Sequence, residues 1–187
     1  KKGFIGTNLY KFFKEKKTKV HSLSFEDFLN SNKKNIDKFD VIINCSSNKK
    51  FIKNKYKVSN DYDLIIAKKI INSKTKLVML STRKIYKLKF NIKESDKKNP
   101  ICNYSKNKLL SECSVEKILI NRTLVLRISN IIGLPNNNKR KLQNTFSDIF
   151  FKMAKRGYIY NNKKIYKDFI SIKKFNEIVF ELIKKNS

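Results

Sequence analysis

Three side chains in the middle of the chain could together move a proton. Tyr104 and Lys108 are four residues apart, so they share one face of a helix. A nearby ammonium lowers the pKa of a phenol from about 10, which would let Tyr104 act as an acid or base near neutral pH. Thr82 ends an apolar run and supplies a hydroxyl. We therefore predict an acid/base site composed of Thr82, Tyr104 and Lys108.

Position in the chain distinguishes Tyr104 from other tyrosines. Because lysine is abundant, Tyr10 and Tyr160 are also followed by a lysine four residues later, and such a pair is often no more than a solvated helix face. Tyr104 opens a helical pattern between two buried strand-like runs, the first of which ends at Thr82. Open α/β sheets bind ligands at the carboxyl ends of their strands. This placement favours chemistry at Tyr104.

Short apolar runs alternate with helical patterns along the chain. The runs expected to form strands are 19–23, 40–45, 76–81 and 123–128, the last three covered on both faces. The patterns expected to form helices are 7–17, 62–71, 104–119, 142–154 and 173–185, together with a helix that starts at the capping box Ser24–Asp27. The alternation predicts an α/β fold with a doubly wound parallel sheet.

Two glycines, Gly3 and Gly6, stand where the first helical pattern begins. In a dinucleotide-binding fold, glycines at this turn let the backbone approach the pyrophosphate, and the helix N-terminus holds the anion. Taken alone, two glycines at this spacing more often belong to an ordinary loop or to close packing. The glycines alone leave these interpretations open.

Seven segments resemble, in the correct order, motifs of the NAD-dependent epimerase/dehydratase family, the extended short-chain dehydrogenases/reductases. The segments are Gly3–Leu9, Asp40–Ser46, Asn60, Ser81–Tyr86, Pro100–Glu112, Leu126–Gly133 and Lys167–Ser171. The resemblance implies a Rossmann-type fold, an NAD or NADP cofactor, and reduction or epimerisation of a nucleotide-activated sugar. It also implies a role in polysaccharide biosynthesis in the cytoplasm.

The resemblance implies roles for individual residues. Tyr104 would be the catalytic acid/base, Lys108 would hold the nicotinamide ribose and tune Tyr104, and Thr82 would hydrogen-bond the reacting group. The cofactor-binding residues would be Gly3, Phe4, Ile5, Gly6, Asn44, Ser46 and Lys108. The substrate-binding residues would be Thr82, Arg83, Asn130 and Lys167, with no metal. For Asn60, Arg127 and Gly133 we favour a structural role.

Several departures from the family pattern narrow the prediction. The chain begins at Lys1 without the first strand of the family fingerprint, and it stops early, so we expect a fragment. We expect an NAD(P)-binding domain over residues 1–135 and a partial substrate-binding segment over 136–187, divided near the polar loop Asn136–Arg140. No acid closes the run 19–23, which favours NADP over NAD.

The subclass can also be narrowed. Sugar 4,6-dehydratases of the family carry an Asp-Glu pair after the catalytic threonine, and Arg83 and Lys84 stand there in this chain. Two cations cannot remove water as an acid and a base do, which argues against 4,6-dehydration. The compact N-terminal half resembles the dTDP-4-dehydrorhamnose reductases more than the longer epimerases. Reduction and epimerisation both remain open.

Composition leaves two rival functions. The formal charge of +29 could serve to bind nucleic acid or another polyanion. Only five of the 44 basic residues are arginine, however, and the lysines are spread over the whole chain, as compositional drift would leave them. The second rival is a non-catalytic Rossmann module that binds a dinucleotide. The three scattered cysteines favour a reducing, cytoplasmic setting, no apolar run predicts a membrane span, and a homodimer is a family expectation.

Overall fold

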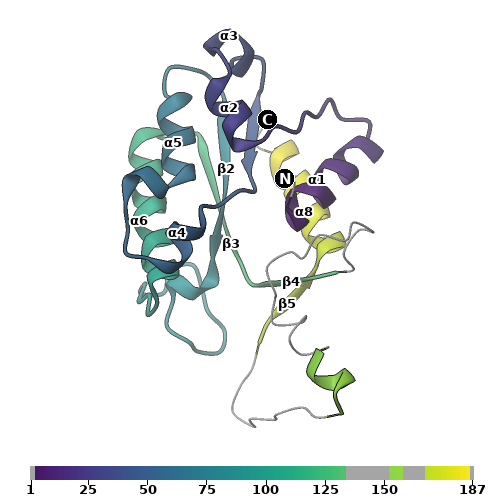
Figure 1. Ribbon diagram of the computed structural model, residues 1–187, viewed down its shortest axis with the longest axis vertical. Coiled ribbons are helices and arrows are strands. Elements are labelled where there is room, and N and C mark those ends of the chain that lie inside the picture. Colours follow the sequence, from purple (N-terminus) through teal and green to yellow (C-terminus); the bar gives the residue numbers. More distant parts are fainter. Residues whose placement is uncertain (1–2, 134–151, 158–166, 186–187) are drawn as a thin grey trace. The chain divides into compact units, whose positions relative to one another are not determined.

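The computed structural model of the 187-residue chain describes residues 3–133, 152–157 and 167–185 (Figure 1). The chain divides into two compact units, one of residues 22–128 and one that combines Lys1–His21 with Ser129–Asn186. The predicted boundary loop Asn136–Arg140 lies outside the described residues. The division into domains at residue 135 therefore stays a prediction.

A three-stranded parallel sheet forms the centre of the unit of residues 22–128 (Figure 1). Its strands are β1 (Val41–Asn44), β2 (Lys76–Thr82) and β3 (Thr123–Ile128), in the order β1-β2-β3. The prediction of parallel strands at these three apolar runs is confirmed. Only β2, paired on both sides, is buried along its length, whereas most of β1 and all of β3 are half-buried.

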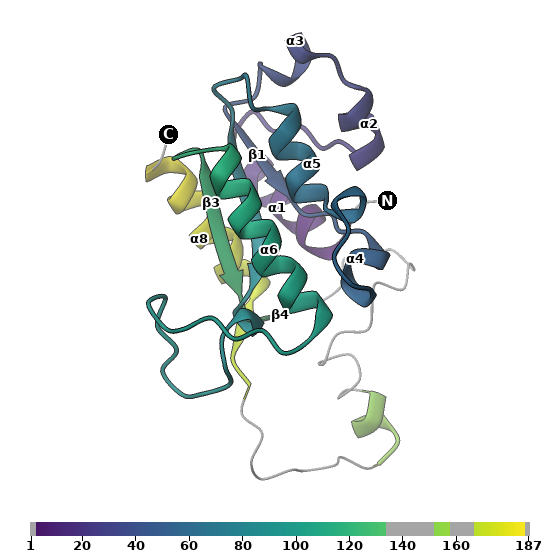
Figure 2. The ribbon, with the colours of Figure 1, turned by 90° about the vertical axis from the view of Figure 1, so that its left-hand side faces the viewer.

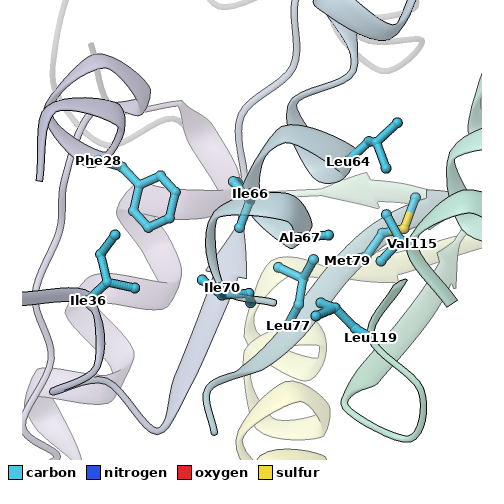
Figure 3. Close-up of a cluster of buried hydrophobic side chains, with 10 residues drawn as sticks. All are labelled: Phe28, Ile36, Leu64, Ile66, Ala67, Ile70, Leu77, Met79, Val115 and Leu119. Atoms are coloured by element: carbon cyan, nitrogen blue, oxygen red, sulfur yellow. The ribbon is translucent and has the colours of Figure 1, made fainter. Parts of the chain in front are cut away.

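Helices cover one face of this sheet. The helices α4 (Lys49–Lys53), α5 (Tyr62–Lys69) and α6 (Asn103–Ile118) lie on the same side of the strands (Figures 1 and 2). Apolar residues of α5, α6 and β2 form a buried cluster with side chains from the two short helices α2 (Phe25–Asn30) and α3 (Lys33–Ile36). The cluster in Figure 3 consists of Phe28, Ile36, Leu64, Ile66, Ala67, Ile70, Leu77, Met79, Val115 and Leu119.

Polar side chains cap the N-termini of several helices in this unit. The predicted capping box is confirmed, because the Asp27 N–H donates to Ser24 Oγ at 3.0 Å and the Ser24 N–H donates to Asp27 Oδ2 at 3.2 Å. Asp61 caps α5 in the same way, accepting from the Leu64 N–H at 3.1 Å. The strand predicted at 19–23 is wrong, since this segment is not part of either sheet and most of it is exposed. A strand exists only through hydrogen bonds to a neighbour, which an apolar pattern cannot supply.

The second unit pairs the two ends of the chain. Here α1 (Phe4–Glu15) packs against α8 (Ile172–Lys185), with the Phe13 and Phe180 ring centroids 5.4 Å apart. The strands β4 (Asn130–Ile132) and β5 (Phe169–Ser171) pair in parallel. The predicted first and last helices are confirmed, and most of the helix predicted at 142–154 lies outside the described residues. Over the described ranges, no helix combines the length and apolar character that crossing a bilayer requires.

Candidate active site

The carboxyl ends of β1 and β2 bring predicted site residues to one edge of the sheet. Asn44 is the last residue of β1 and Thr82 is the last residue of β2. Helix α6 packs against β2 and against the short 3-10 helix η2 (Arg83–Ile85) that follows it. Tyr104 lies in the first turn of α6, and Lys108 follows one turn later. The sheet edge and α6 therefore position the predicted catalytic residues.

Lys108 is buried and ion-paired. Its Nζ donates to Asp63 Oδ2 at 2.8 Å, and the two side chains are 6% and 3% exposed. The ammonium also lies 5.5 Å from the centroid of the Phe51 ring. Burial acts to lower the pKa of Lys108, but the charge of Asp63, the phenol of Tyr104 and the hydrogen bond to Asp63 together raise it. Lys108 therefore keeps its proton inside the protein.

Asp63 joins three residues that the sequence assigns to the cofactor. Its Oδ1 accepts from Asn44 Nδ2 at 2.6 Å, while its Oδ2 holds Lys108. Asn44 Oδ1 in turn accepts from the backbone N–H and the hydroxyl of Ser46, at 3.0 and 2.7 Å. One continuous chain of hydrogen bonds thus runs from α6 through α5 to the residues just after β1.

The motifs in the sequence did not predict a role for Asp63. An acid in the first turn of a helix ordinarily interacts with the helix dipole, and Asp61 two residues earlier already accounts for the cap. The available signal in the sequence was that Asp63 directly precedes the apolar run Leu64–Ala67. A buried acid requires a partner, and only the fold shows that this partner is Lys108.

The expected lowering of the Tyr104 pKa is wrong. The pKa of Tyr104 is raised, first because the phenol is withdrawn from water, which disfavours the phenolate. The positive charge of Lys108 does lower it, as expected, but the negative charges of Asp63 and Cys102 act in the opposite direction. The phenol therefore stays protonated at neutral pH.

Thr82 lies at the same edge of the sheet, but its hydroxyl is hydrogen-bonded to the backbone. It is buried, and its Oγ1 accepts from the Lys84 N–H at 3.3 Å, capping η2, where Arg83 is half-buried. Within the part of the chain that the structure describes, no hydrogen bond joins Thr82, Tyr104 and Lys108 to one another. Nor do any three His, Cys, Asp or Glu side chains there form a group that could hold a metal ion.

A second ion pair, between the buried Glu112 and the half-buried Arg127, lies one turn further along α6. Glu112, which is fully buried, accepts from Arg127 Nη2 at 2.8 Å and from Arg127 Nε at 3.1 Å, and the Ser81 hydroxyl also donates to it. Arg127 Nη1 reaches the Tyr86 hydroxyl at 2.7 Å. These bonds tie α6 to β2 and β3, as expected for a structural role of Arg127.

The remaining predicted site residues belong to the other unit. Gly3 caps α1, which has no acidic residue in its first turn, and a Cβ on Gly3 would meet nothing within 4 Å. Phe4, Ile5 and Gly6 form the first turn that follows it. The space at Gly3, at the N-terminus of a helix without a side-chain cap, fits the approach of a phosphate.

Asn130 and Lys167 come close to each other through the β4–β5 pair. Asn130 Nδ2 donates to the Asp168 carbonyl at 3.0 Å, next to the exposed Lys167. Gly133 lies at the end of β4, where a Cβ would come within 2.5 Å of Ile172 Cγ2. This crowding explains the glycine by packing, in line with the structural role expected for it.

Similar folds occur among solved structures. A hypothetical dTDP-4-dehydrorhamnose reductase from Sulfolobus tokodaii is 24% identical with a TM-score of 0.72, covering 99% of this chain and 70% of that one. UDP-N-acetylglucosamine 4-epimerase from Bacillus cereus is 16% identical with a TM-score of 0.73, covering 98% and 71%. The Bordetella bronchiseptica enzyme WbmG, in complex with NAD and UDP, is 16% identical with a TM-score of 0.69, covering 95% and 64%.

These matches confirm the Rossmann-like fold, with parallel strands and flanking helices. A comparison with curated protein sequences finds no match. The family model described as the RmlD substrate binding domain matches residues 1–156, which is most of the chain. The chain therefore belongs to the RmlD substrate binding domain family.

Proposed function

We propose that this protein is an NAD(P)-dependent oxidoreductase or epimerase that acts on a nucleotide-activated sugar. Its family supports this class of substrate, and so do two similar structures, a hypothetical dTDP-4-dehydrorhamnose reductase and a UDP-N-acetylglucosamine 4-epimerase. The observation that carries the proposal is the placement of Lys108. Its ammonium is held beside Asn44 at the carboxyl end of β1, one helical turn after Tyr104.

A nicotinamide dinucleotide would supply or accept a hydride at a sugar carbon. The backbone from Gly3 to Gly6 would bind its pyrophosphate, since the space at Gly3 admits a ligand. Lys108, with Asn44 and Ser46 nearby, would bind the nicotinamide ribose. Each of these assignments transfers a family role to a residue whose surroundings fit it.

Tyr104 would exchange a proton with the sugar oxygen while the hydride moves. Because its pKa is raised, the phenol carries its proton at neutral pH, which is the protonation state that an acid needs. This favours reduction of a keto-sugar. Thr82 would hydrogen-bond the same oxygen, and Arg83, Asn130 and Lys167 would contact the sugar nucleotide.

Replacing Tyr104 with Phe tests the reaction. We expect Tyr104→Phe to slow NADPH oxidation by about 10²- to 10⁴-fold on dTDP- and UDP-linked 4-keto-hexoses, the usual contribution of a general acid. The matched control is Tyr10→Phe, which removes another phenol followed by a lysine four residues later and should retain the activity. Full activity in Tyr104→Phe would refute the proposed role.

The cofactor is tested by fluorescence titration of the chain with NADPH and with NADH. NADPH should bind more tightly, because the segment 19–24 contains no acid to accept the ribose hydroxyls of NADH and the nearby lysines favour a phosphate. Lys108→Ala should weaken both. Tighter binding of NADH would reverse the cofactor assignment, and binding that survives Lys108→Ala would argue against the ribose contact.

A further inference from the structure

Asp63 is placed to control the charge at the proposed active site. It is the second residue of α5, 3% exposed, and both of its carboxylate oxygens are engaged. Its two partners come from different elements, Lys108 from α6 and Asn44 from β1. No residue of α5 was expected to contribute to catalysis.

The ion pair explains how Lys108 can be buried while charged. An ammonium withdrawn from water loses its proton or requires an anion within hydrogen-bonding distance. An ammonium has three N–H donors, and in the described structure Asp63 takes one of them. Two donors remain for ribose hydroxyls, and Lys108 is held in place without being saturated.

We propose that Asp63 is a positioning residue: its carboxylate fixes the Lys108 ammonium beside Asn44 and cancels its charge next to Tyr104. The inference rests on the proposed function, whose reacting groups are Tyr104 and Lys108. An unpaired Lys108 ammonium would stabilise the Tyr104 phenolate and so help to remove the phenol proton. The Asp63–Lys108 ion pair has no net charge, so the proton stays on Tyr104. Asp63 thereby favours Tyr104 as an acid, the form that reduction needs.

The charges around Tyr104 come from few groups. From α5 these are Asp63 and, further away, Asp61, which acts on Lys108. From the start of α6 there is Cys102, and after β2 there is Lys84, which acts on Cys102. Since Asp63 is the anion bonded directly to Lys108, its removal should produce the largest change.

The test is the titration of Tyr104 in the chain without cofactor. The eight tyrosines are labelled with ¹³C at Cζ, and the Tyr104 resonance is assigned with Tyr104→Phe. In Asp63→Asn we expect the Tyr104 midpoint to fall by about one to three pH units, because the phenolate becomes the counter-ion of Lys108. A midpoint that stays or rises would overturn the proposal.

Two further variants separate charge from packing. Asp63→Asn combined with Lys108→Met removes both charges, so the Tyr104 midpoint should return close to that of the wild type. This variant leaves no unpaired buried charge, and a midpoint more than about one unit from wild type would contradict the cancellation. Glu116→Gln removes one exposed negative charge on α6, eight residues after Lys108, and should leave the midpoint unchanged.

NADPH binding distinguishes this inference from the function on which it rests. Asp63→Asn should weaken NADPH binding at least about tenfold and Asp63→Glu should restore part of it, because the longer acid keeps the charge but shifts the ammonium. Unchanged binding in Asp63→Asn would refute the positioning role. A wild-type chain that binds no dinucleotide while Tyr104 still shifts would refute the proposed function and retain the electrostatic link between Asp63 and Tyr104.

Discussion

Two ion pairs lie one turn apart on α6, and they have opposite polarity. At Lys108 the helix supplies the cation and α5 supplies Asp63. At Glu112 the helix supplies the anion and β3 supplies Arg127. The Glu112 carboxylate is saturated by the arginine and by a serine hydroxyl, whereas the Lys108 ammonium has one hydrogen bond. A buried, paired charge is common to both, so it does not by itself mark a functional site.

The two cations, Arg127 and Lys108, differ in whether they can still donate hydrogen bonds to a ligand. An arginine fork that is bonded to a carboxylate and to Tyr86 has a fixed geometry, which suits a joint between strands and helix. A lysine ammonium with unused donors can take a ligand while staying paired. We infer that the Glu112 pair is structural, and that Lys108 belongs to the proposed active site.

The largest effect is expected from breaking the saturated pair. Glu112→Gln leaves the Arg127 guanidinium without its anion and should lower the free energy of unfolding by about 3 kcal/mol. Glu116→Gln on the same helix should change it by less than about 0.5 kcal/mol, because Glu116 is exposed. Urea denaturation followed by circular dichroism measures both. Equal effects of the two substitutions would remove the basis for calling the Glu112 pair structural.

The free energy of unfolding should depend on pH through Tyr104, which lies one turn before Lys108 on α6. The pKa of Tyr104 is raised, so the folded chain holds this proton to higher pH than the unfolded chain does. The stability that the proton contributes is complete below about pH 10 and is lost as the pH rises from there through the folded pKa.

The measurement is the free energy of unfolding of wild type and Tyr104→Phe between pH 9 and pH 12, roughly the window set by the ordinary tyrosine pKa. Above pH 10 the wild type should lose up to about 1.4 kcal/mol per pH unit more than the variant. Parallel curves would show that Tyr104 is not perturbed. The Glu112 pair should contribute no such slope, because arginine keeps its proton in this range.

The smallest effect on stability is expected when each pair is replaced as a whole. Glu112→Met combined with Arg127→Leu leaves no unpaired charge, so the free energy of unfolding should fall by only about 1 kcal/mol. Much of this loss should come from the Ser81 and Tyr86 hydroxyls, which lose their hydrogen-bond partners. Asp63→Asn with Lys108→Met should be similarly mild. Only the second double variant should lose NADPH binding. If both double variants lost NADPH binding, or if neither did, the Lys108 pair and the Glu112 pair would not differ in function.

Much of the fold could be predicted because it follows from local patterns. The apolar runs at β1, β2 and β3, the helical spacing of α5 and α6, and the capping box at Ser24 depend on residues close together in sequence. The segment 19–23 failed as a strand because pairing requires a distant partner. The order of family motifs predicted Thr82, Tyr104 and Lys108 as the site, and these assignments stay predictions.

The sequence by itself determined the three strands of the central sheet and the main helices, that Tyr104 and Lys108 share a helix face, and which family the chain belongs to. Only the tertiary structure decided that Lys108 meets Asp63, 45 residues away, and that burial outweighs Lys108 in setting the pKa of Tyr104. Helical spacing reports neighbours within one element. The electrostatics of a buried group depend on how far water is excluded and on which charges from other elements approach it, and folding alone brings these together.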